Sequence, residues 1–70
     1  MDLAKRIMAR KNDLGLTWKE IGLPLHFAVR TVQQWGQGTA IPRTCDIPDI
    51  CKVLECTPNY LFGFSEDPNG

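Results

Sequence analysis

The stretch from residue 17 to residue 38 constrains the fold of this 70-residue chain more than any other part. Its apolar residues recur at the spacing that two short helices joined by a sharp turn require, and they are Ile21, Leu25, Phe27, Val32 and Trp35. Thr17 can cap the first of these helices, and Glu20 completes a capping box. The pattern predicts a helix-turn-helix whose second helix runs from about residue 28 to residue 35 or 36, where Gly36 and Gly38 end it.

Helical patterns extend over the rest of the chain. A first helix is expected over about residues 2–14, with Asp2 as its N-cap and Gly15 as its stop. A fourth helix is expected over about residues 46–54 and a fifth over about residues 57–63, which Thr57 caps and Pro58 opens. Five short helices without a strand pattern predict an all-α fold, a compact helical bundle that contains the helix-turn-helix.

Two segments modify this plan. Pro24 lacks an amide hydrogen and would clash with the carbonyl of Glu20 in a regular helix. The helix that Thr17 caps should therefore be short, kinked or finished by about residue 23. Residues 65–70 are polar with Pro and Gly, which is typical of a flexible tail or the start of a linker. The expected organisation is one domain over residues 1–64 followed by that tail.

Charge is unevenly distributed along the chain, although eight basic and eight acidic residues cancel. Residues 1–43 hold seven Lys and Arg against three Asp and Glu, a balance of +4, whereas residues 44–70 hold one against five, a balance of −4. Such a polar molecule would offer one face to phosphate groups. A chance asymmetry on a solvated surface is the alternative.

The cysteines and the other titratable groups indicate no catalytic or metal site. Zinc ligands usually include cysteine pairs two to four residues apart, and Cys45, Cys51 and Cys56 lack this spacing. We therefore expect Cys51 and Cys56 to be small apolar residues in a reducing compartment. A zinc site formed by the three cysteines and His26 is the weaker alternative. The sequence shows no paired carboxylates, phosphate-cradling glycine loop or catalytic triad. We therefore expect no enzymatic activity, metal or cofactor. No run approaches the roughly 18 apolar residues of a membrane span, so we expect a cytoplasmic protein with no membrane partner.

The second helix of the helix-turn-helix presents side chains suited to reading DNA. Val29, Arg30, Gln33 and Gln34 fall on its exposed positions. Arg30 can form paired hydrogen bonds with guanine, Gln34 can do so with adenine, and Val29 offers an apolar surface to the thymine methyl group. Because such a helix enters the major groove, double-stranded DNA is the predicted partner. The alternative is an ordinary solvated helix surface.

Phosphate contacts are expected around the same motif. The positive end of the helix that Thr17 caps attracts anions, and Lys, Arg, Gln and Thr side chains donate to phosphate oxygens. The predicted phosphate-contacting residues are Lys11, Thr17, Lys19, Gln37, Thr39 and Arg43. Trp18 can either donate its indole hydrogen to a phosphate or form a lid on the core.

Several segments, taken in order, resemble one known family. They are Arg10-Lys11 with residues 14–17, residues 31–35 with Gly38, residues 41–43, residues 47–54 and residues 57–63. Over about residues 3–63 the chain resembles the lambdoid phage repressors and Cro proteins, the Cro/cI-type helix-turn-helix family. The resemblance implies a lambda repressor-like domain that binds a palindromic operator as a homodimer. It implies base contacts at Trp18, Val29, Arg30, Gln33 and Gln34, and a dimer interface at Cys56, Pro58 and Phe62.

The chain departs from the family pattern within the motif. Gly36 stands where many members have a Glu that pairs with a basic residue of the first helix, so an ion pair with Lys11 is absent. His26 and Phe27 replace the Gly-Val that is common in the turn. Gly22 occupies a position where Ala is usual.

Two hypotheses of function follow. The first is a transcriptional regulator, a phage repressor or Cro-like protein that acts at the nucleoid of a bacterial host cell, with an antirepressor or RNA polymerase as further partners. The second is a protein-interaction module, antitoxin-like or antirepressor-binding, that keeps the helix-turn-helix scaffold, because a fold does not fix a function. The neutral net charge and the apolar residues Phe62 and Phe64 suit the second hypothesis.

Overall fold

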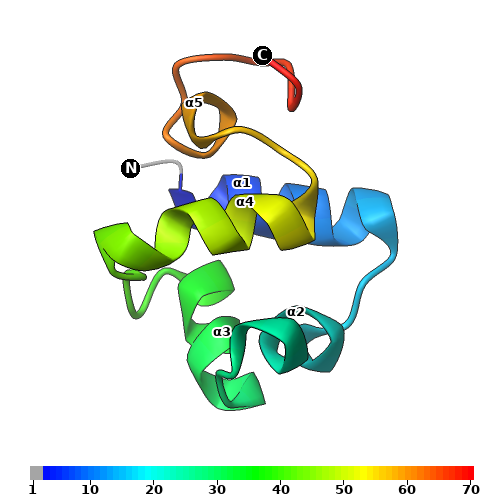
Figure 1. Ribbon diagram of the computed structural model, residues 1–70, viewed down its shortest axis with the longest axis vertical. Coiled ribbons are helices and arrows are strands. Elements are labelled where there is room, and N and C mark those ends of the chain that lie inside the picture. The colour runs from blue at the N-terminus through cyan, green and yellow to red at the C-terminus, as the bar shows by residue number, and fades with distance from the viewer. Residues whose placement is uncertain (1–2) are drawn as a thin grey trace.

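Helices make up all the regular structure in residues 3–70, the part of the chain that the computed structural model describes. In chain order they are α1 (Leu3–Leu14), α2 (Trp18–Leu25), α3 (Val29–Gln37), the 3-10 turn η1 (Thr44–Asp46), α4 (Ile47–Leu54) and α5 (Pro58–Leu61). Figure 1 shows α2 and α3 at one end, α1 and α4 across the middle, and α5 with the C-terminus at the other end. The predicted all-α bundle of five short helices is confirmed. None of the helices in residues 3–70 has the length and apolar character that a membrane span requires.

The core draws on every α-helix of the bundle. The fully or nearly fully buried residues are Leu3, Ile7, Ile21, Val32, Trp35, Ile47, Ile50, Cys51, Leu54, Tyr60 and Leu61. Leu25 and Phe27 are partly buried against this core, and the Phe27 ring meets the Trp35 ring edge-on at a centroid distance of 4.9 Å. Burying one such large apolar side chain, relative to leaving it exposed, stabilises the folded state by about 1.5–3 kcal/mol. The inward positions predicted within residues 17–38 are therefore confirmed.

Helix α2 is short, which is one of the three predicted alternatives, and it continues past Pro24 to Leu25, two residues beyond the alternative end near residue 23. Pro24 removes only the hydrogen bond that its amide would give to the Glu20 carbonyl, and the helix ends one residue later. His26 then takes a left-handed conformation with φ 60°, and its amide donates to the carbonyls of Gly22 and Leu23. The last turn is thus closed without the missing bond.

The other helix ends lie within one or two residues of the predictions. Gly15 and Gly38 adopt positive φ at 67° and 79°, as expected of glycines that stop a helix. The sequence also predicts that Gly36 ends the helix, but it lies within α3. The N-cap expected at Asp2 lies outside the described residues. Thr57 caps α5 by accepting a hydrogen bond from the Tyr60 amide at 3.2 Å, but α5 ends at Leu61 rather than at residue 63.

The turn between α2 and α3 is held close by Gly22. The amide of Phe27 donates to the carbonyl of Gly22 at 3.0 Å. A Cβ atom on Gly22 would lie 2.8 Å from the Phe27 carbonyl oxygen and 3.2 Å from Cγ2 of Val32. Glycine therefore lets the backbone of the turn and the core side of α3 approach α2 more closely than any other residue would.

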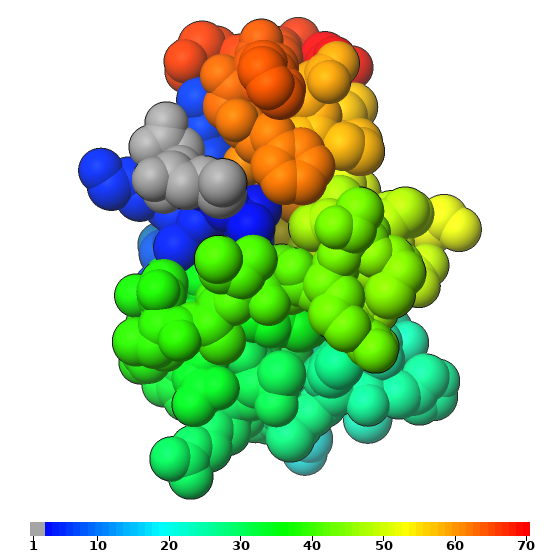
Figure 2. Space-filling view, turned by 90° about the vertical axis from the view of Figure 1, so that its left-hand side faces the viewer, coloured from blue at the N-terminus to red at the C-terminus, as the bar shows by residue number. Residues whose placement is uncertain are grey.

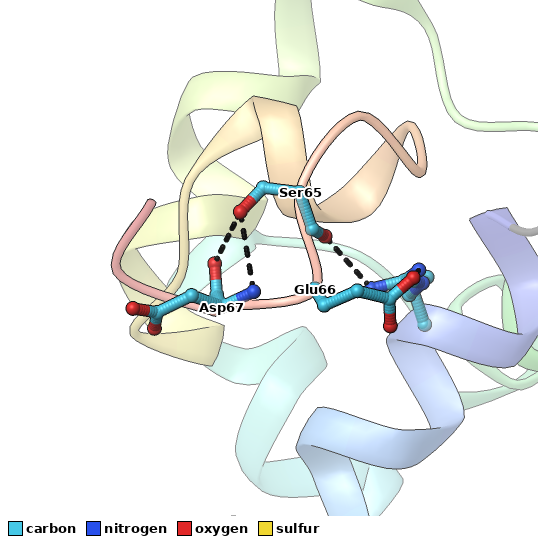
Figure 3. A network of polar contacts seen from close by, with 4 residues as sticks. Ser65, Glu66 and Asp67 are labelled. Atoms are coloured by element: carbon cyan, nitrogen blue, oxygen red, sulfur yellow. Dashed lines mark hydrogen bonds and ion pairs between the residues drawn. The ribbon is translucent and has the colours of Figure 1, made fainter.

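Residues 65–70 lie against α1 and α5. The Arg6 guanidinium donates to the Ser65 carbonyl at 2.9 Å and pairs with the Glu66 carboxylate at 3.2 Å. In the same segment, the Ser65 hydroxyl donates to the Asp67 carbonyl and accepts from the Asp67 amide (Figure 3). The Thr57 amide donates to the Pro68 carbonyl at 2.9 Å. These contacts fold the end of the chain back over α5, and the mobility that the sequence predicts for it stays a prediction.

Candidate nucleic-acid interface

Helix α3 has one buried face and one face that carries the predicted base-reading side chains. Val32 and Trp35 are buried beneath the helix. Arg30 is exposed, and among residues 3–70 its guanidinium forms no salt bridge. Val29 is 44% exposed. The two glutamines, at positions 33 and 34, are half-buried and lie at the edge of the same face.

The space-filling view in Figure 2 shows where this surface lies. The segment from α2 to α3, coloured teal to green, forms one end of the molecule. The orange region around α5 lies at the opposite end. The predicted reading helix is therefore far from the residues of the predicted dimer interface.

The N-terminus of α2 carries the predicted capping box. The Thr17 hydroxyl accepts a hydrogen bond from the Glu20 amide at 3.1 Å, and the Glu20 carboxylate accepts one from the Thr17 amide at 2.9 Å. The Glu20 carboxylate thereby already occupies part of this positive helix end, where a phosphate would also bind. Lys19 and Thr17 are exposed beside it. Lys19 supplies a positive charge next to the helix end, which offsets the Glu20 carboxylate.

Trp18 lies between α1 and α3 rather than free on the surface. Its side chain is half-buried and packs against the core. Nζ of Lys11 lies 4.8 Å from the centroid of its ring. A Cβ atom on Gly36 would come within 3.0 Å of Trp18 Cζ3 and 3.1 Å of Cζ2. We call Lys11, Trp18 and Gly36 the tryptophan wedge.

The remaining predicted phosphate contacts follow α3. Gln37 and Thr39 are exposed, and the Thr39 hydroxyl donates to the Gln34 carbonyl at 3.4 Å. Nε of Arg43 lies 3.1 Å from a carboxylate oxygen of Asp46. The hydrogen bond to Asp46, together with its negative charge, raises the pKa of Arg43 above its ordinary value. Arg43 therefore stays charged, but part of its charge is already neutralised within the chain.

Two arginines counted in the basic half of the sequence hold the fold together instead of facing solvent. Arg6 pairs with Glu66, and its guanidinium lies 4.6 Å from the centroid of the Tyr60 ring. Arg10 donates to the carbonyls of Leu54 and Glu55 at 3.1 and 3.2 Å. Less of the positive charge of residues 1–43 is therefore available to phosphate groups than the charge count predicts. Sequence reasoning missed these roles because the partners lie 44–60 residues away along the chain.

The predicted dimer residues lie in and next to α5, at the end of the molecule opposite α2 and α3. Pro58 is exposed, and Phe62 is 40% exposed. Phe64 is 83% exposed, and the predicted interface did not include it. Cys56 is half-buried, and burial beside the Cys51 thiol raises its pKa to about 12.

The Cys51 and Cys56 thiols are neutral at physiological pH. Cys51 is buried and its pKa is raised by desolvation, whereas Cys45 is exposed. All three cysteines are free, and in residues 3–70 no group of three or more His, Cys, Asp or Glu side chains is placed to hold a metal ion. Cys51 and Cys56 therefore act in the fold as small apolar groups.

Comparison with known proteins gives a distant similarity to a regulator of the helix-turn-helix type. No protein-family model matches the chain, and no solved structure matches it significantly. Over 67 residues, 96% of its length, the chain is 27% identical to the HTH-type transcriptional regulator DicA of Escherichia coli strain K12. The match covers 50% of that protein, so the chain spans about half the length of this curated relative. The chain is thus distantly similar to an HTH-type transcriptional regulator, and its α2–turn–α3 unit lies inside the matched length.

Proposed function

We propose that the chain is a DNA-binding domain of a transcriptional regulator, which inserts α3 into the major groove of double-stranded operator DNA. The observation that carries the proposal is the two-sided character of α3. Val32 and Trp35 anchor one face, and Arg30 extends from the other with no carboxylate partner among residues 3–70. An unpaired guanidinium on an anchored helix can form the paired hydrogen bonds that distinguish guanine. The distant similarity to an HTH-type regulator supports this assignment.

The finer assignments form part of the same proposal. Arg30 and Gln34 read base edges, with Val29 and Gln33 beside them. Lys19 and Gln37 contact the phosphate groups that flank the bases read by α3. The protein acts as a phage repressor or Cro-like regulator at the bacterial nucleoid. Two copies contact each other through the surface around Phe62, and each copy inserts its α3 into one half of a palindromic site.

Selection of binding sites from a random duplex library tests the proposal. A protein that acts as a symmetric dimer should select a two-fold symmetric site, with half-sites about 34 Å apart or a multiple of that spacing. A selected site without symmetry would contradict the dimer but not DNA reading. If the chain retains no duplex DNA at low salt and micromolar concentration, DNA binding itself is refuted.

Substitutions on the selected site then separate base reading from phosphate binding. Arg30→Ala should weaken binding by about 5- to 150-fold, equivalent to about 1–3 kcal/mol, and relax the preference at one base pair in each half-site. Lys19→Ala should weaken binding to all sequences alike and reduce the salt slope by about one. Lys52 is an exposed lysine on α4, and Lys52→Ala is the matched control. This substitution should change neither the DNA affinity nor the salt slope. Equal loss from Arg30→Ala on every sequence would contradict its role in reading bases.

One observation favours the protein-interaction hypothesis as a second candidate. Phe64 is 83% exposed and Phe62 is 40% exposed, so two aromatic side chains near α5 are available to a partner. Exposed aromatic residues are common in protein interfaces. Under this hypothesis, Phe64→Ser would abolish binding to the protein partner, and the chain would bind no DNA.

A further inference from the structure

We propose that Trp18 is a positioning residue that sets the orientation of α3, and that it does not read bases as the family resemblance implies; the inference rests on the proposed function. The tryptophan wedge joins three helices at one point. Lys11 belongs to the last turn of α1, Trp18 is the first residue of α2, and Gly36 belongs to the last turn of α3.

The surroundings of the indole leave it poorly placed to enter a DNA groove. The Lys11 ammonium lies over its ring, and its benzo edge is directed at Gly36. The side chain also packs against the core. To contact a base it would have to leave all three partners, and the indole carries one hydrogen-bond donor and no acceptor.

The position of Gly36 on α3 explains why the wedge affects DNA reading. Residues three and seven positions apart lie on the same side of a helix, so Gly36 shares a stripe with Gln33 and Val29. The Trp18 ring therefore fixes how closely this stripe approaches α1 and how α3 is rotated about its axis. Recognition groups need placement to within about 0.5 Å, so a small rotation of this stripe changes the fit to base edges.

The wedge also accounts for a departure seen in the sequence. At the position of Gly36 the resembled family often has a Glu that pairs with a basic residue of the first helix. Here the Trp18 ring occupies the space next to residue 36 and gives Lys11 an aromatic partner instead. A Cβ atom at position 36 would collide with the ring, so the observed placement of the Trp18 ring depends on glycine at position 36.

A double-mutant cycle on the selected DNA site tests the proposal. Trp18→Ala and Gly36→Ala should each weaken binding by about tenfold, and the double substitution should be no weaker than either single one, because both disturb the same contact. Trp18→Phe, which keeps an aromatic ring, should stay within about threefold of the unmodified chain. In the variants that disturb the wedge, the preference should weaken at all the selected base pairs together, because the whole of α3 is displaced.

Two results on DNA would overturn the proposal. The first is a Trp18→Ala protein that loses preference at one base pair and keeps it at the others, which would make Trp18 a reading residue. The second is strict additivity of the two substitutions, since independent effects would mean that Trp18 and Gly36 do not act together.

A stability cycle separates failure of the wedge from failure of the proposed function. Gly36→Ala should lower the urea midpoint when Trp18 is present, because the new methyl group displaces the ring. In the Trp18→Ala background the same substitution should raise the midpoint, because alanine favours a helix over glycine. The reversal of sign supports the wedge even if the chain binds no DNA. The same sign in both backgrounds refutes it.

Discussion

Replacement of Gly22 by alanine should destabilise the protein, although alanine is the usual residue at this position in the family that the chain resembles. In an open helix, Gly→Ala would stabilise by about 1 kcal/mol. Here the new Cβ would lie 2.8 Å from the Phe27 carbonyl oxygen and 3.2 Å from Val32 Cγ2. The oxygen belongs to the backbone, so it can move only if the turn between α2 and α3 moves with it.

The size of the effect follows from three contributions. Overpacking costs about 1–3 kcal/mol, and weakening of the 3.0 Å hydrogen bond from the Phe27 amide to the Gly22 carbonyl costs about 1 kcal/mol. After the gain in helix propensity, the expected loss is about 2 kcal/mol. One kcal/mol corresponds to about 4–8 °C in a domain of this size, so the midpoint of thermal unfolding should fall by about 8–16 °C. The protein should still fold, because a chain of this length is stable by several kcal/mol.

Urea and thermal unfolding followed by circular dichroism measure this loss. Leu23→Ala is the matched control, because Leu23 is the next residue of α2 and its side chain is 70% exposed. The control should change the free energy of unfolding by less than about 0.5 kcal/mol. A Gly22→Ala protein as stable as the unmodified chain would refute the inference that the turn between α2 and α3 excludes a Cβ atom at this position.

Three further predictions concern stability. His26 and Glu55 have positive φ values of 60° and 53°, and a left-handed backbone is strained in residues with a Cβ atom. His26→Gly and Glu55→Gly should therefore each raise the free energy of unfolding by about 0.5 kcal/mol in calorimetry, and a decrease would contradict this reasoning. Arg10→Met should lower the free energy of unfolding by about 2 kcal/mol in urea unfolding, because two hydrogen bonds from a charged donor are lost. An unchanged urea midpoint would show that these two bonds contribute nothing to stability. The raised pKa of Cys56, about 12, means that the folded state keeps its thiol proton where the unfolded chain releases it. The contribution of this thiol to stability should therefore be intact below about pH 9 and decline from there toward pH 12. In thermal scans, Cys56→Ala should flatten the decline, and an equally steep decline in the variant would exclude this thiol as the cause.

The sequence alone predicted the five helices and the inward face of the helix-turn-helix. Val32 and Trp35 are three positions apart, and Thr17 and Glu20 form a capping box across one turn. Such signals act between residues close in the chain, so they can be read without knowing how the helices pack. The exposed position of Arg30 follows from the same periodicity, because its neighbours on the other side of α3 are buried.

Tertiary structure alone decided the roles of several residues that the sequence assigned to ligand binding or left unexplained. Arg10 is one of the basic residues in the sequence count, but its guanidinium binds carbonyls at the end of α4, 44 and 45 residues away. The family resemblance implies that Trp18 contacts DNA, whereas its ring is held between Lys11 and Gly36. Contacts of this kind depend on the distances and angles between packed helices, which no local spacing encodes. For that reason the periodic pattern determined which residues are buried, whereas the packing of α1, α2 and α3 determined which charged and aromatic side chains remain available to a partner.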